Sequence, residues 1–275
     1  MIEVPEAAVL AGQINKTLTG KKIRKAITAH TPHKFAWYFG DPRKSNGLLA
    51  GRIVGRAVSF GGLVEIPAGD ALICLGEGAN LRYYPADEKL PDRHQFYLGF
   101  EDGTSFLGTI QMYGAICVFP AGTRVTNKYY LLAKEKPSPL SARFDPPYFE
   151  KLFDANSDQL SLKAFLATEQ RIPGLGNGVL QDILFNAKMQ PKKKVSTMSD
   201  REKRDLFASI KSILKDMVGK GGRDTEKDLF GDFGGYKTRL SKNTAGTPCL
   251  VCGTVILKEA YLGGSIYYCK KCQKN

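Results

Sequence analysis

Long hydrophobic runs are missing from this sequence of 275 residues. No stretch approaches the roughly 20 apolar residues of a membrane-spanning helix. The opening segment MIEVPEAAVL lacks a basic region and a long apolar region, so we expect no secretory signal. Hydrophobic residues make up 43% and charged residues 24% of the chain, as in an ordinary soluble protein. The length predicts about two domains and a small appendage, with no membrane partner.

Acidic residues are scarce relative to basic ones. The chain has 27 Asp and Glu against 40 Lys and Arg, a net charge of +13. The excess is concentrated in residues 186–275, which hold 19 basic and 9 acidic side chains. This part of the molecule should attract polyanions such as nucleic acid, although a basic surface that only aids solubility is the alternative.

Common enzyme motifs are also absent: the sequence has no GKS/T phosphate loop, no HExxH and no GxSxG. The glycines of GLGNG (174–178) follow a predicted helix instead of a strand, which argues against a dinucleotide site. His30, His33 and His94 show no metal-ligand spacing. These absences exclude several familiar hydrolase and nucleotide-binding classes.

Cysteine is rare, and four of the six cysteines lie in the last 27 residues. Cys74 and Cys117 stand in apolar runs, where a small buried side chain is expected. The other four form two CxxC pairs sixteen residues apart: Cys249, Cys252, Cys269 and Cys272. This spacing predicts one structural zinc ion held by four thiolates on a hairpin, with two disulfides as the alternative. Basic side chains on the hairpin, such as Lys270, are then free to touch DNA.

The periodicity of the chain changes twice, which predicts an α+β protein. Residues 5–18 read as a helix, and short alternating runs up to about 133 indicate a β-sandwich. Helical patterns return after a Pro- and Ser-rich linker, at about 146–155, 161–169, 178–188 and 199–218. A Gly-rich stretch over 219–246 reads as a long loop. The predicted divisions are 1–133 for the β-sandwich domain with its leading helix, 134–145 for the linker, 146–246 for the helical domain and 247–275 for the zinc-finger hairpin.

Two local patterns carry possible chemistry. The segment RIPGLGN (171–177) makes a tight double turn between two helices, and Asn177 is a favoured N-cap. Backbone N–H groups near Gly176 and Asn177 can bind a phosphate, although the segment can equally be a plain helix connection. Glu3 and Glu6 lie at the start of the first helix, where carboxylates are stabilised in the ionised form; the alternative is helix-end decoration.

Taken in this order, these features resemble the formamidopyrimidine-DNA glycosylase / endonuclease VIII family over nearly the whole chain. The resemblance rests on the N-terminal carboxylates, the β-rich region, the segment IPGLGNGVLQDILFNAKMQP, the segment GGRDTEKDLFG and the cysteine pairs. It implies a helix–two-turn–helix element and removal of damaged bases from double-stranded DNA. In such proteins an N-terminal proline amine attacks the sugar, while the adjacent glutamate, here Glu3, manages protons. A monomer located in the cytoplasm, at the nucleoid, is expected.

The departures from the family pattern concern the reacting groups. Ile2 stands where the family has proline, so the α-amine belongs to Met1 or, if Met1 is removed, to Ile2. Glu77 replaces a methionine that fills the void left in the DNA, and Gly264 replaces an arginine of the finger. Tyr113 remains as a residue able to stack between bases. Lys237 and Arg223 are candidates to contact DNA in place of the lost cations.

Three hypotheses follow from this pattern. The first is a DNA glycosylase in which Glu3, with Glu6, activates water or assists base departure, with weak lyase activity. The second is a glycosylase and lyase that uses the α-amine of Met1 or Ile2 as nucleophile. The third is a protein that binds damaged DNA without catalysis.

Overall fold

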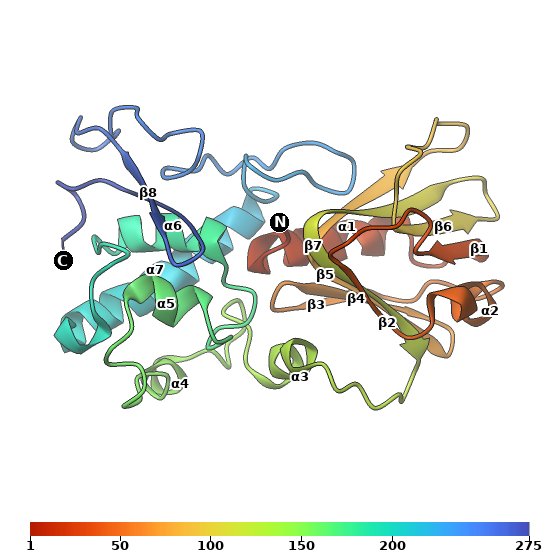
Figure 1. Cartoon of the computed structure of the whole chain (residues 1–275), viewed down its shortest axis with the longest axis horizontal. Coiled ribbons are helices and arrows are strands. Elements are labelled where there is room, and N and C mark those ends of the chain that lie inside the picture. The colour runs from red at the N-terminus through yellow and green to blue at the C-terminus, as the bar shows by residue number, and fades with distance from the viewer. Residues whose placement is uncertain (275) are drawn as a thin grey trace.

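The computed structural model describes residues 1–274, without the side chain of Glu77. It consists of a β lobe, a helical lobe beside it, and a two-stranded hairpin against the helical lobe (Figure 1). The predicted α+β class is confirmed. No helix in the described part of the chain is long and apolar enough to cross a membrane.

The β lobe contains one bent sheet in place of two separate ones. Its order is β1-β6-β7-β5-β4-β3, and β2 pairs with β7 outside this path. The long strands β5 and β7 form the spine, with a bulge between Glu77 and Ala79. A bulge bends and twists a sheet, which lets β7 pair with β6 at one end and with β2 at the other. The strands are β1 (Ile23–Thr28), β2 (Ala36–Phe39), β3 (Val58–Phe60), β4 (Leu63–Ala68), β5 (Ala71–Tyr84), β6 (Phe96–Phe100) and β7 (Ser105–Pro120).

Helix α1 (Val4–Thr17) lies against this sheet, as the sequence predicts. Leu10 and Ile14 are buried from its inner face and join the core of the sheet. A helix that presents apolar residues at three- and four-residue intervals buries one stripe and exposes the other. This packing fixes the segment that precedes the helix, and thereby the position of Glu3.

Two parts of the β lobe differ from the expected run of strands. Residues Lys128–Glu135 form helix α3, which begins at Asn127, whose side chain accepts a hydrogen bond from the Tyr130 N–H. Residues Ser45–Leu49 form the short helix α2 after a 3-10 turn at Pro42–Lys44. Neither helix was predicted: α2 lies within the predicted β-sandwich division, and α3 crosses its expected end at residue 133.

The helical lobe contains the four predicted helices: α4 (Pro146–Glu150), α5 (Leu162–Ala167), α6 (Asn177–Asn186) and α7 (Asp200–Gly219), with a 3-10 turn at Val195–Thr197. Ser199 caps α7, and the Glu202 carboxylate accepts a hydrogen bond from the Ser199 N–H. The buried faces of these helices form a second core, and Val4 of the N-terminal segment belongs to it. The N-terminal segment therefore connects the two lobes.

The remaining chain packs on the helical lobe. Beyond Gly219, which ends α7, the predicted loop contains no helix or strand and runs to the hairpin β8 (Leu257–Tyr261) and β9 (Gly264–Tyr268). The Gln273 side chain accepts a hydrogen bond from the Cys269 N–H and donates one to the Met189 carbonyl, which follows α6. The hairpin is thereby fixed to the helices.

Candidate active site and metal centre

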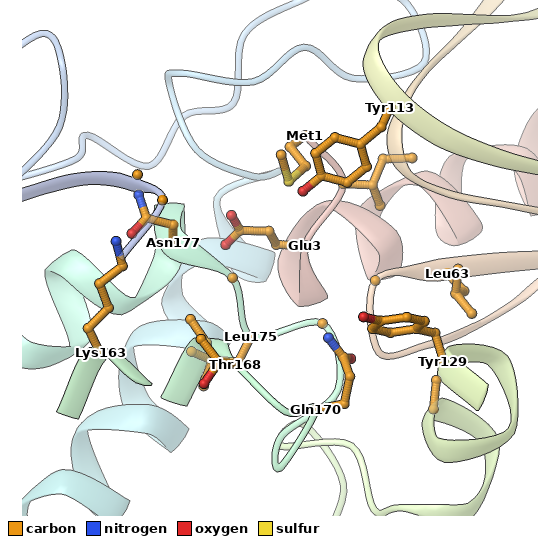
Figure 2. A pocket seen from close by; sticks show the side chains of 18 of the residues that line it. Met1, Glu3, Leu63, Tyr113, Tyr129, Lys163, Thr168, Gln170, Leu175 and Asn177 are labelled. Carbon is orange, nitrogen blue, oxygen red and sulfur yellow. The ribbon is translucent and has the colours of Figure 1, made fainter. Parts of the chain in front are cut away.

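A cavity of about 360 Å³ lies where the two lobes and the hairpin meet. Figure 2 shows Tyr113, Leu63 and Tyr129 on its β-lobe side and Lys163, Thr168 and Asn177 on the opposite side. Glu3 and Met1 lie between these walls, and residues 262–264 of the hairpin close a third side. Among the described residues, none of the loop 219–246 lines the cavity.

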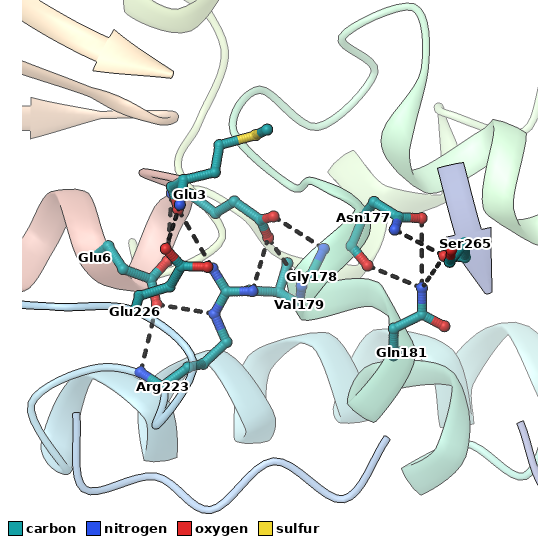
Figure 3. Close-up of polar contacts among 10 residues, drawn as sticks. Glu3, Glu6, Asn177, Gly178, Val179, Gln181, Arg223, Glu226 and Ser265 are labelled. Atoms are coloured by element: carbon teal, nitrogen blue, oxygen red, sulfur yellow. Dashed lines mark hydrogen bonds and ion pairs between the residues drawn. The ribbon is translucent and has the colours of Figure 1, made fainter. Parts of the chain in front are cut away.

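Glu3 is buried at this cavity and caps a helix of the other lobe. Its two carboxylate oxygens accept hydrogen bonds from the N–H groups of Gly178 and Val179, at 2.9 and 2.8 Å (Figure 3). These N–H groups lie in the first turn of α6 and have no partner within the helix, and the helix dipole favours an anion there. Burial raises the pKa of Glu3 above its ordinary value even though Arg223 and these amides lower it. The amides at the helix start act on Glu3 in the expected direction, and burial opposes them.

Arg223 is the cation that faces both N-terminal carboxylates. Its Nε and Nη2 donate to the two oxygens of Glu6 at 2.8 and 2.7 Å, and its Nη1 lies 3.7 Å from Glu3. Only 2% of Arg223 is exposed, so the guanidinium cannot reach a phosphate. The predicted DNA contact of Arg223 is wrong. Its actual partner, Glu6, lies more than 200 residues away in the sequence and could not be predicted from a local pattern.

The N-terminal residues occupy two environments. Ile2 is buried in the β-lobe core, and Met1 is partly exposed at the cavity. The α-ammonium group of Met1 forms an ion pair with Glu226 of the long loop. An ammonium held by a carboxylate has no lone pair to offer as a nucleophile.

The turn before α6 differs in detail from the prediction. Gly176 is the N-cap, and Asn177 is the first residue of the helix. The Asn177 side chain donates to the Ser265 carbonyl of β9 at 2.8 Å and lines the cavity. Gly174 has a φ of +74°, and a Cβ there would lie 2.1 Å from the Gly62 N, so glycine is required where the lobes touch. Glu3 occupies the N–H groups of Gly178 and Val179, so a phosphate at this helix start would have to use the N–H groups that precede them.

Lys163 is a cavity residue that the sequence analysis missed. It projects from α5, is 3% exposed, and its ammonium group donates to the Tyr261 carbonyl. Burial lowers the pKa of Lys163. A Cβ added to Gly264 would lie 3.4 Å from the Lys163 Nζ, so this lysine stands beside the glycine that replaces the family's arginine. A lysine within a helical pattern gives no signal of such a position, since it usually faces solvent.

The other predicted DNA contacts lie at different distances from the cavity. Tyr113 lines it and is 42% exposed. Lys237 is exposed and 3.9 Å from Asp224, outside the cavity. Lys270 is exposed in the finger. The side chain of Glu77 lies outside the described residues.

The four finger cysteines converge as their spacing predicts. Their Sγ atoms all lie within 4.8 Å of one another, with separations of 3.9 Å for Cys249 and Cys272 and 3.4 Å for Cys252 and Cys269. Tetrahedral thiolates at the usual zinc–sulfur distance are roughly 3.8 Å apart. The thiols are unbridged, so the donor set fits a metal ion and not two disulfides.

Comparison with known proteins identifies the same family. A model of the formamidopyrimidine-DNA glycosylase H2TH domain matches residues 136–228. Formamidopyrimidine-DNA glycosylases of Bordetella petrii and Cronobacter sakazakii are 27% and 28% identical to the chain over the full length of both proteins. These matches extend well beyond the helix–two-turn–helix segment.

Solved structures agree in fold. The MutM (Fpg) protein of Thermus thermophilus aligns with a TM-score of 0.79 and 21% identity, covering 98% of each chain. The Lactococcus lactis Fpg bound to DNA with an abasic site aligns with a TM-score of 0.81 and 21% identity, covering 99% of this chain and all of that one. The chain thus contains a region that matches the formamidopyrimidine-DNA glycosylase H2TH domain, is similar to these glycosylases over its full length, and shares the fold of the solved proteins.

Proposed function

We propose that this protein is a DNA glycosylase that removes a damaged base from duplex DNA. The observation that carries the proposal is the buried carboxylate of Glu3 at a cavity bounded by both lobes and the hairpin. The family supports the activity, and several of its structural relatives were solved with DNA containing an abasic site or an oxidised pyrimidine. A damaged nucleotide turned out of the stack would enter the cavity from the groove between the lobes.

The charge distribution supports a duplex as partner. The C-terminal 90 residues carry most of the net positive charge, and this part includes the finger and the long loop. Lys237 and Lys270 are exposed there and are proposed to contact phosphates, while Asn177 and Lys163 face the cavity. Such contacts position the DNA without reading its sequence.

Glu3 is proposed to act on the sugar and not on the base. When an N-glycosidic bond breaks, positive charge develops on the sugar ring, and a fixed carboxylate stabilises it. The amides of α6 hold both Glu3 oxygens without using all of their lone pairs, since a carboxylate has about four acceptor sites. A free lone pair remains to orient a water molecule toward the sugar. Glu6, tied to Arg223, keeps the segment in place and does not reach the cavity.

Strand cleavage through an amine is expected to be weak. The Met1 ammonium group is paired with Glu226, and Ile2, which replaces the family's proline, is buried. Forming a Schiff base from this terminus would require the ion pair to break and the ammonium to lose a proton. We therefore assign base removal to Glu3 and only residual lyase activity to the α-amine.

One structural zinc ion is proposed at the four finger cysteines. Bound there, it would hold the finger in shape, and its closed set of four thiolates leaves no position for a reacting group. Residues 262–264 at the tip of this hairpin line the cavity, so the finger also fixes one wall of the proposed active site.

The test is strand scission on a panel of duplexes, each with one oxidised purine, oxidised pyrimidine, alkylated base, uracil or abasic site. Each reaction is developed with and without alkali. We expect breaks on a base lesion that appear mainly after alkali, because base removal then precedes chemical cleavage of the strand. If as many strand breaks appear without alkali as with it, the α-amine acts as the nucleophile.

Glu3→Gln is expected to lower base release at least a hundredfold while duplex binding persists. Glu65→Gln is the matched control, since Glu65 is a buried carboxylate of the same lobe that bonds to Tyr130 outside the cavity. Unchanged base release by Glu3→Gln would refute the assignment. An inactive panel with retained DNA binding would instead identify a non-catalytic reader of damaged DNA.

A further inference from the structure

Strand β2 presents its alternate side chains on one outer face of the β lobe. Side chains at positions i and i+2 of a strand share a face. Trp37 and Phe39 accordingly line one small hollow, whereas Tyr38 between them packs on the core of the sheet. Phe35 precedes the strand in the same alternation, and its carbonyl accepts the Gly114 N–H of β7.

Four aromatic side chains are exposed on this side of the molecule. The exposed fractions are 51% for Phe35, 56% for Trp37, 42% for Tyr113 and 49% for Tyr129. The parallel pairing of β2 with β7 places Ala36 opposite Gly114, so Phe35 stands beside Tyr113. Figure 2 shows Tyr113 and Tyr129 on the same wall of the main cavity. We call these four residues the aromatic shelf.

The shelf is continuous with the proposed active site. The hollow under Trp37 shares Leu63 and Tyr129 with the main cavity. This hollow holds only about 30 Å³, far less than a nucleobase requires, so a ligand would lie on the rings and not within the hollow. An open row of rings beside a nucleotide-sized cavity differs from an enclosed pocket for a small molecule.

The spacing and charge of the shelf fit nucleic acid bases. Alternate side chains of a strand are about 6.6 Å apart, and stacked bases are about 3.4 Å apart, so one base fits between two rings. The Lys34 ammonium lies 5.4 Å from the Phe35 ring, and Lys128 and Arg124 are exposed near Tyr129 in the sequence. Aromatic rings interleaved with basic side chains are the usual surface for single-stranded DNA.

We propose that the aromatic shelf stacks unpaired bases next to the cavity, so that the protein prefers DNA whose base pairs are already open over fully paired duplex. The inference rests on the proposed function, because it takes DNA as the partner in the cavity. It adds a substrate class: a lesion in a bubble or at a junction of single and double strands.

The chain contains a single tryptophan, which makes Trp37 an intrinsic reporter. The full-length protein is titrated with a DNA carrying a short central bubble, with the fully paired duplex of the same sequence, and with the free single strand. Bubble and single strand are expected to quench the Trp37 emission, because a stacked base contacts the indole. The paired duplex is expected to bind with little quenching.

Affinity for the same DNAs separates the shelf from general DNA binding. Trp37→Ala is expected to weaken binding to the bubble roughly tenfold and to the duplex less than twofold, given the usual contribution of one stacked base. Trp37→Phe should restore most of the loss. Phe230→Ala is the matched control, since Phe230 is 49% exposed but lines neither cavity.

The outcomes distinguish this inference from the proposed function. Normal duplex binding with no quenching by the bubble and no effect of Trp37→Ala would overturn the shelf and leave the proposed function intact. Equal losses for bubble and duplex would also overturn it, because they would indicate a structural role for Trp37. Failure to bind any of the DNAs would overturn both.

Discussion

At the scale of single residues, three charged side chains determine how the N-terminus is held. Glu3, Glu6 and Arg223 are all less than 10% exposed, and Arg223 faces both carboxylates. Buried charges are tolerated when each is paired and hydrogen-bonded, and removing one partner leaves an uncompensated charge. The triad therefore specifies the position of Glu3 more than it adds to overall stability.

Arg223→Met should destabilise the protein by about 3–5 kcal/mol at neutral pH, because it leaves two carboxylates buried without their cation. The pKa of Glu3 is raised, so the folded state binds a proton at Glu3 more readily than the unfolded state does. Such a group stabilises the fold below its unfolded pKa and loses that contribution as the pH rises. Without Arg223 the pKa of Glu3 rises further, and the deficit should shrink from pH 7 toward pH 4.

Urea unfolding of both proteins across this range measures the effect. Arg223→Met combined with Glu6→Gln is the control, because it removes one unpaired charge and should recover part of the stability. A deficit that does not change with pH would show that packing, and not charge, accounts for the loss.

The sequence located Glu3 and Glu6 but did not identify the groups that bind them. Their acidic type and position at a helix start are local signals, readable from a few residues. Arg223 and the amides of Gly178 and Val179 reach them only after the lobes have packed together. Contacts between residues this far apart in the chain produce no periodic pattern in a single sequence.

At the scale of elements, helix α6 begins with a cap supplied from another lobe. Gly178 must lack a side chain, because a Cβ there would lie 1.7 Å from the Arg223 Nη1. The close approach of the guanidinium, the carboxylate and the first turn of α6 therefore depends on this glycine.

Gly178→Ala should lower the melting temperature by several degrees, although alanine ordinarily favours a helix over glycine by up to about 1 kcal/mol. The control is Gly12→Ala in α1, where nothing lies within 4 Å of the added Cβ, and which should be neutral or stabilising. Calorimetry of the two variants gives the comparison. If Gly178→Ala stabilises the protein as Gly12→Ala does, the Arg223 side chain is able to move away from the added methyl group.

The elements predicted correctly are those with a clear amphipathic pattern. Helices α1 and α7 bury one face each, and the period of that face is visible in the sequence. Helix α3 was missed because it buries only Tyr130 and Ala133 in eight residues. The pairing of strand β2 could not be predicted, because its partner, residues 114–117, lies far along the chain and runs parallel.

At the scale of the whole molecule, the cavity has walls from the β lobe, the helical lobe and the hairpin. No sequence pattern marks such a meeting point, so the lining residues Lys163 and Tyr129 were not predicted. The hairpin wall depends on the finger, which is fixed to α6 by the bond between the Tyr267 N–H and the Gln181 side chain.

Removing the metal should loosen this wall and weaken duplex binding at least tenfold, because metal binding and folding of such fingers are coupled. Cys249→Ser tests the same point without a chelator, with Cys117→Ser, a cysteine outside the finger, as control. DNA titrations at fixed salt measure the change, and limited proteolysis should show new cleavage within 247–275. Unchanged affinity after verified metal loss would remove the finger from the DNA interface.

The bond between Glu3 and α6 also has a consequence for the order of events during synthesis. Glu3 leaves the ribosome well before its partner Gly178, which follows 175 residues later. At the usual elongation rate of 5–20 residues per second, the carboxylate waits about 9–35 s for its amides. The β lobe therefore has time to fold with its leading segment still open, and the arrival of the helical lobe closes the site.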